Sequence, residues 1–165
     1  MKVELNSIVI DLNEKEIKLF DVINDALKNN KPLNFTSEHF SKKTVGFIKK
    51  FTNEYMIGPY KPFEKPIKTN VIRDIIGDKW AGMVESLTTE ELTELVCAGH
   101  DLKCEFLTDV CMLNIACLIK DRKPNDVLKL LGMPIPTKED MDKVRDENPW
   151  VFEIGMETAQ HLSKN

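Results

Sequence analysis

The chain has 165 residues, of which 42% are hydrophobic and 30% are charged. This balance is typical of a globular protein, and the length is sufficient for one core with an appendage. The net charge of -4 argues against nucleic acid or an anionic membrane as the main partner. No apolar run reaches the length of a membrane span, and the first residues do not begin a secretory signal. We therefore expect a cytoplasmic or nuclear protein.

The N-terminal region alternates between apolar and polar residues, which predicts a β-strand over residues 3–12. The alternation changes parity at residues 6–7, which indicates a bulge or a bend. Residues 13–15 contain an asparagine and are expected to form a turn. Ile17 and Leu19 would then open the second strand of a hairpin.

From residue 20 the apolar spacing becomes helical, and it predicts a helix through residues 22–27. Residues 33–35 are few enough to form an edge strand. Thr36 or Ser37 is expected to cap the next helix, whose apolar positions fall within residues 40–51. This order of hairpin, helix, short strand and helix resembles the POZ fold.

The middle of the chain combines a proline-rich loop with two further helices. Residues 57–66 have no regular period, so we expect an extended, solvent-exposed linker rather than a docking strip. Residues 70–85 have a helical apolar face that Gly77 interrupts. Thr88, with Glu91 three residues later, forms a capping box that begins the next helix.

The last third of the chain predicts three helices separated by prolines. The first helix, over residues 103–120, is apolar on more of its circumference than one core face requires. Pro124 suits the first turn of the second helix, and Gly132 ends it. Two prolines then impose an extended link, and Thr137 begins a charged third helix. Two such short helices are marginal in water, so we expect them to need a partner.

Residues with catalytic or metal-binding chemistry do not form a convincing constellation. The four cysteines have no close Cys-x-x-Cys pair, and we interpret them as reduced core residues: Cys97, Cys104, Cys111 and Cys117. A zinc site, or a thiol-dependent enzyme in which His100 and Asp101 assist a cysteine, is the less favoured alternative. We expect no catalytic residue, no metal and no cofactor.

Two segments carry a resemblance to a known family. Residues 119–127 read Ile-Lys-Asp-Arg-Lys-Pro-Asn-Asp-Val, and residues 137–150 read Thr-Lys-Glu-Asp-Met-Asp-Lys-Val-Arg-Asp-Glu-Asn-Pro-Trp. Both resemble the C-terminal signature of the S-phase kinase-associated (SKP-type) adaptor family. Upstream, Trp80 and several residues between positions 92 and 110 fall on the family pattern.

The resemblance implies an α+β protein, with a BTB/POZ-like domain (a small sheet with packed helices) over residues 1–120. A C-terminal helical extension over residues 121–165 would bind the F-box. The implied function is that of a non-catalytic adaptor, which links F-box substrate receptors to a cullin scaffold in an SCF-type ubiquitin ligase. A free chain of this kind is also expected to form a homodimer.

The resemblance also assigns site residues. The apolar residues expected to face the F-box are Ile115, Ile119, Val127, Leu131, Met133, Val144 and Trp150. The cullin-binding positions are His100 and Asp101, where the family pattern has an Asn-Tyr pair. Because a carboxylate replaces an aromatic residue there, we also consider a divergent paralogue that serves a non-ubiquitin assembly without cullin.

Overall fold

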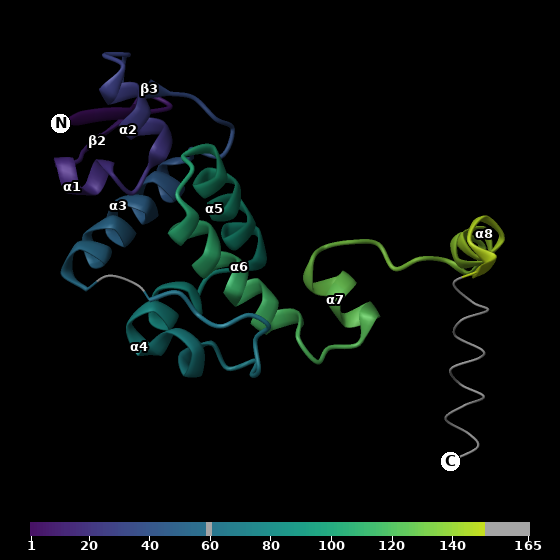
Figure 1. Ribbon diagram of the computed structural model, residues 1–165. Helices are drawn as coiled ribbons and strands as arrows, with labels where there is room; N and C mark the ends of the chain where they lie inside the picture. The colour runs from purple at the N-terminus through teal and green to yellow at the C-terminus, as the bar shows by residue number, and fades with distance from the viewer. Residues whose placement is uncertain (59–60, 151–165) are drawn as a thin grey trace. The chain divides into compact units, whose positions relative to one another are not determined.

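A computed structural model of the chain describes residues 1–58 and 61–150 (Figure 1). The described residues form a three-stranded sheet and eight helices, which confirms the expected α+β class. The chain divides into two compact units, Met1–Arg122 and Lys123–Asn165, and each is treated by itself below. The assignment of separate functions to residues 1–120 and 121–165 stays a prediction, and the C-terminal tail lies outside the described residues.

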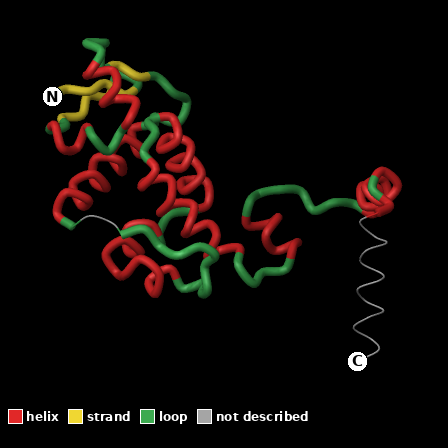
Figure 2. The backbone as a smooth tube through the Cα atoms, viewed as in Figure 1, coloured by secondary structure: helices red, strands yellow, loops and turns green. Residues whose placement is uncertain are grey.

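The sheet is built near the N-terminus, as Figure 2 shows. Strands β1 (Lys2–Leu5) and β2 (Ile8–Asp11) pair antiparallel, and β3 (Asn34–Phe35) pairs with β1 in parallel. Asn6 and Ser7 form the hairpin turn with φ angles of 48° and 66°. Two consecutive left-handed residues match the twist of the flanking strands in a two-residue turn. The change of parity at residues 6–7 therefore marks the hairpin turn itself.

The expected turn at residues 13–15 was wrong, because these residues begin a short helix, α1 (Glu14–Ile17). The Asn13 side chain accepts hydrogen bonds from the N–H groups of Lys15 and Glu16. The Glu16 carboxylate accepts in return from the Asn13 N–H at 2.7 Å, which completes a capping box. Asparagine suits a turn and a helix cap alike, and here the cap prevails.

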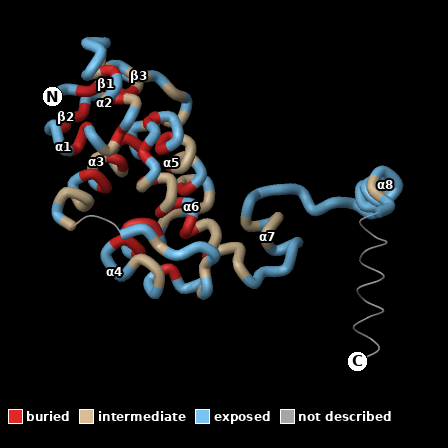
Figure 3. The backbone as a smooth tube through the Cα atoms, viewed as in Figure 1, coloured by how far each residue is buried: buried red, intermediate tan, exposed pale blue. Residues whose placement is uncertain are grey.

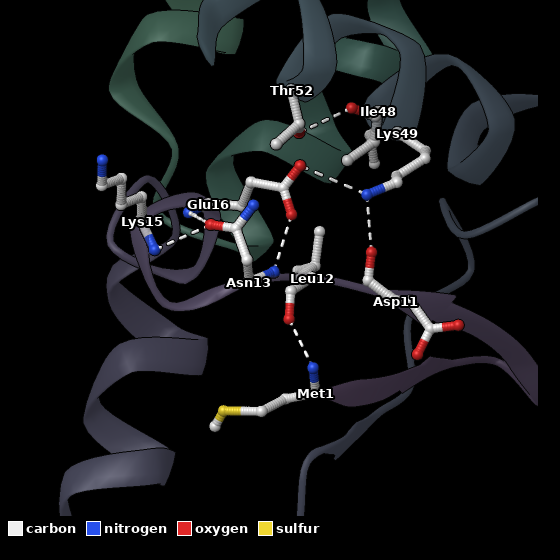
Figure 4. A network of polar contacts seen from close by, with 9 residues as sticks. All are labelled: Met1, Asp11, Leu12, Asn13, Lys15, Glu16, Ile48, Lys49 and Thr52. Atoms are coloured by element: carbon white, nitrogen blue, oxygen red, sulfur yellow. Dashed lines mark hydrogen bonds and ion pairs between the residues drawn. The ribbon is translucent and has the colours of Figure 1, made fainter.

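Glu16 also connects α1 to the rest of the first unit (Figure 4). Its side chain is buried, and its Oε1 lies 3.3 Å from the Nζ of Lys49. The same ammonium group donates a hydrogen bond of 2.6 Å to the carbonyl of Asp11. A buried carboxylate is stable only where charge and hydrogen bonds compensate its lost hydration. This network therefore ties the hairpin to α1 and to the helix that carries Lys49.

Five longer helices complete the first unit, and three of them begin or kink at residues whose local chemistry explains it. They are α2 (Asp21–Lys28), α3 (Lys42–Ile57), α4 (Ile72–Val84), α5 (Thr89–Asp101) and α6 (Glu105–Ile119). Ser41, rather than Thr36 or Ser37, caps α3 by accepting from the Thr44 N–H. Helix α4 kinks at Gly77, whose φ is 77°, and Thr88 with Glu91 caps α5, both as predicted.

The core of the first unit lies between the sheet and helices α1 to α6, and Figure 3 shows its buried segments. Phe51, Trp80 and Phe106 form its aromatic centre, with ring centroids 4.4 to 5.3 Å apart. Most apolar residues of α6 belong to this core or pack against it: Phe106, Leu107, Val110, Cys111, Leu113, Ile115, Cys117 and Leu118. Among the described residues, no helix has the length and apolar character that a membrane crossing requires.

The proline-rich loop is anchored more firmly than expected. Phe63 and Ile67 pack against the core, and the Nζ of Lys65 lies 3.2 Å from the Oδ1 of Asp109 on α6. Residues 59–60 lie outside the described residues. The expectation of a solvent-exposed linker over residues 57–66 is therefore corrected at Phe63, whose ring has core surface to cover, whereas the other described residues between 61 and 66 are exposed.

Candidate protein-binding surface

The second unit begins with helix α7 (Pro124–Leu130), whose ends follow the predicted chemistry. Its first residue is a proline, which has no N–H to leave unpaired at that position. Gly132 ends the helix with a φ of 65°. The Met133 N–H donates to the carbonyl of Leu128 at 2.8 Å, and the Gly132 N–H donates to that of Lys129 at 3.2 Å. These two bonds form a Schellman motif, which fixes the direction of the chain after α7.

Helix α8 (Lys138–Glu147) begins at the capping box predicted for Thr137. The Thr137 N–H donates to the Asp140 carboxylate at 2.8 Å, and the Asp140 N–H donates to the threonine hydroxyl at 3.2 Å. Hydrogen bonds from the side chain and then the backbone of Thr137 lower the pKa of Asp140. The start of α8 is therefore defined without help from a core.

Neither α7 nor α8 contains a buried residue, as Figure 3 also shows. We use the term C-terminal apolar surface for the exposed large apolar residues in the described part of this unit, which ends at residue 150. They are 40% to 60% exposed: Leu131, Met133, Ile135, Met141, Val144 and Trp150. Short helices need tertiary packing to be stable in water, so we expect this surface to be covered by a partner.

The residues predicted to face an F-box are divided between the two units. Ile115 and Ile119 lie on α6 of the first unit and are half-buried, and Ile115 packs against the core. The others lie in the second unit, where Val127 is half-buried and the remainder belong to the C-terminal apolar surface. Met112, which is half exposed, shares the helical spacing of Ile115 and Ile119. Its spacing of three and seven residues from these two isoleucines is a signal that the sequence already contains.

The predicted cullin-binding pair lies at the C-terminal end of α5. The His100 side chain is 87% exposed, and its Nδ1 lies 3.9 Å from the Oδ1 of Asp101. The Asp101 carboxylate accepts a hydrogen bond from the hydroxyl of Ser37. Asn6 in turn accepts from the Ser37 N–H at 3.0 Å. The carboxylate that replaces the family's aromatic residue therefore holds the loop after β3 against α5.

Three of the four cysteines lie in surroundings that disfavour the thiolate. None forms a disulfide, and Cys104, Cys111 and Cys117 are buried. Burial raises the pKa of Cys104 to about 11 and that of Cys111 to about 12, and it also raises the pKa of Cys117. A nucleophilic or metal-binding cysteine needs the opposite shift. Within the described ranges, no group of three histidine, cysteine or acidic side chains could hold a metal.

Fold and surface together define a class of protein: an α+β domain of the BTB/POZ-like type, followed by a helical extension with exposed apolar residues. Residues 105–151 match the family model described as "Skp1 family, dimerisation domain".

Two curated proteins extend the match along the chain. The S-phase kinase-associated protein 1 homolog of Tetrahymena thermophila is 24% identical over 161 residues, which cover 92% of this chain and 95% of that protein. The Suppressor of kinetochore protein 1 of Schizosaccharomyces pombe is 27% identical over 120 residues, which cover 72% of each chain. The resemblance expected from the sequence is thereby confirmed: residues 105–151 match the Skp1 family model, and the chain is similar to both of these proteins over most of its length.

Proposed function

We propose that this chain is a non-catalytic adaptor that links F-box substrate receptors to a cullin scaffold in an SCF-type ubiquitin ligase. The observation that carries the proposal is the C-terminal apolar surface. All its members fall within the segment that matches the Skp1 family model. A set of apolar side chains that stays exposed on short, capped helices is suited to receive an apolar helix of another protein.

In this proposal, the F-box helices cover the apolar residues of α7, α8 and the end of α6. Binding would be stabilised by about 25 cal/mol for each Å² of apolar surface removed from water. Trp150, which is 60% exposed, has the most surface to contribute and would close over the bound helix. The Schellman motif at the end of α7 and the capping box at the start of α8 lower the conformational entropy that these segments lose on binding.

The cullin contact is proposed at the end of α5, where His100 is exposed and Asp101 is engaged with Ser37. An aromatic side chain would offer apolar area at such a contact, whereas a carboxylate needs a cationic partner once it is desolvated. This observation favours a second candidate function. In it, the chain joins F-box proteins into an assembly that has no cullin and does not attach ubiquitin.

The two candidates separate in a mixing experiment monitored by size-exclusion chromatography with light scattering. The full chain is combined with F-box domains from its own organism, then with the cullin N-terminal domain. A ternary complex supports the ligase adaptor. A binary complex that leaves cullin unbound supports the alternative. Absence of any F-box complex at micromolar concentrations would refute both.

We also propose that two copies cover the C-terminal apolar surface when no receptor is present. Sedimentation of the chain alone should then give a dimer that an F-box domain converts to a heterodimer. A monomer at all concentrations would contradict this. The proposed location is the cytoplasm or the nucleus, which imaging of a fluorescent fusion tests.

A further inference from the structure

The link between α7 and α8 reads Met133-Pro134-Ile135-Pro136 and is fixed at both ends. On one side, the Met133 N–H is bonded to α7, and Gly132 has the left-handed conformation of a Schellman motif. On the other side, the capping box of α8 begins at the residue after Pro136. The link therefore has defined starting and end points, although it belongs to no helix or strand.

The two prolines further restrict the link. Each has a φ near -65°, and each confines the residue before it to extended conformations. Met133 and Ile135 are thereby both held extended, and their side chains are 52% and 45% exposed. An apolar side chain that is already held in place loses little conformational entropy when a partner covers it.

The backbone of the link excludes one kind of partner. Proline has no N–H, and the N–H of Met133 is already used, so at most the N–H of Ile135 could pair with another chain. A β-strand partner needs a row of alternating donors and acceptors. The link can therefore be recognised through its side chains, as an apolar helix would recognise it, and not by strand addition.

We propose that Ile135 is an anchor for the F-box helix and that its two flanking prolines hold it ready for binding. This inference rests on the proposed function and adds a residue that the family resemblance did not assign. Ile135 lies two residues after Met133, so the anchor would extend the apolar surface from the end of α7 towards the start of α8. An F-box helix that contacts both α7 and α8 would then also contact the link between them.

The test measures the affinity of the full chain for the F-box domain that binds the wild type most tightly, by titration calorimetry. Ile135→Ala should weaken binding about tenfold, since it removes an apolar group that is half exposed before binding. Replacement of both prolines by alanine keeps the isoleucine but frees the link, and it should weaken binding about threefold to tenfold. Ile57→Ala is the matched control, because Ile57 is 79% exposed on α3.

Three outcomes are decisive. If the wild type does not bind any F-box domain, the proposed function fails and the anchor fails with it. If the wild type binds and Ile135→Ala binds equally well, the anchor is overturned while the adaptor function stands. An equal loss in the Ile135 and Ile57 variants also overturns the anchor, because the loss would not be specific to the link. Circular dichroism of each variant shows that the helices are retained.

Discussion

Trp150 gives the sharpest prediction for the proposed F-box surface. Its side chain is 60% exposed, whereas Trp80, the other tryptophan, is 5% exposed in the core. A tryptophan has up to about 250 Å² to bury, so about 150 Å² remain, and at 25 cal/mol per Å² they are worth at most about 4 kcal/mol. Ordering of the side chain lowers this value. Trp150→Ala should therefore cost about 2–4 kcal/mol of binding, or about 30-fold to 800-fold in affinity.

The indole also reports on binding directly. At a concentration at which sedimentation shows the free chain to be a monomer, addition of an F-box domain that lacks tryptophan should shift the fluorescence of the chain to shorter wavelength, because Trp150 leaves water. Trp150→Phe retains much of the apolar area and should bind more tightly than Trp150→Ala, but without the shift. Trp80 is buried before and after binding, so it should contribute no change.

Two results would refute this reasoning. If Trp150→Ala binds within threefold of the wild type, the indole is not an anchor. If the wavelength shift persists in Trp150→Phe, it originates from Trp80, and the partner alters the core of the first unit instead.

The first unit and its thiols support three further predictions. Lys49→Met should lower the free energy of unfolding, measured by urea denaturation, by about 1–3 kcal/mol, because it leaves the buried Glu16 carboxylate without its cation. Lys50→Met, at an exposed position, should have almost no effect. Gly99→Ala should cost about 1–3 kcal/mol, since its Cβ would lie 2.7 Å from the Thr108 Oγ1, whereas Gly82→Ala meets no atom within 4 Å and should be neutral or stabilising. The three buried cysteines should react with Ellman's reagent only after unfolding. From about pH 9 the unfolded chain loses thiol protons that the folded chain keeps, because burial raises the pKa of these thiols. Their contribution should therefore lower the free energy of unfolding as the pH rises from 9 to 12.

Each of these predictions has a result that contradicts it. Equal stability of the Lys49 and Lys50 variants would show that the buried ion pair adds nothing. Equal stability of the two glycine variants would mean that α5 and α6 can separate without cost. Rapid modification of all four cysteines in the native chain would contradict the burial on which the raised pKa values depend.

Helix ends were the part of the fold that the sequence predicted best. Thr88 and Thr137 act through hydrogen bonds to residues three positions away, and Pro124 and Gly132 act through their own backbone conformation, so their signals are local. The hairpin turn was misplaced, because asparagine can serve either a left-handed turn or a helix cap. The choice depends on strand pairing, which is not local in sequence.

The candidate site was predictable to the extent that it depends on local composition. Apolar residues on short charged helices indicate exposed apolar surface, and the structure shows that exposure for Val144 and Trp150. The bond between Ser37 and Asp101 joins residues 64 positions apart, and no sequence period encodes it. The proposed role of Ile135 could not be predicted from the sequence pattern, because one apolar residue between two prolines has no helical or strand period.

Hydrogen exchange of the full chain tests the central claim most directly, when it is measured at a concentration at which the free chain is a monomer, with and without a saturating F-box domain. The adaptor account predicts slower exchange of backbone amides in α7, the link and α8, with little change in β1, β2 and α1. A complex that leaves α7 and α8 exchanging at their unbound rates would contradict the account, because the C-terminal apolar surface would then not be what the partner covers.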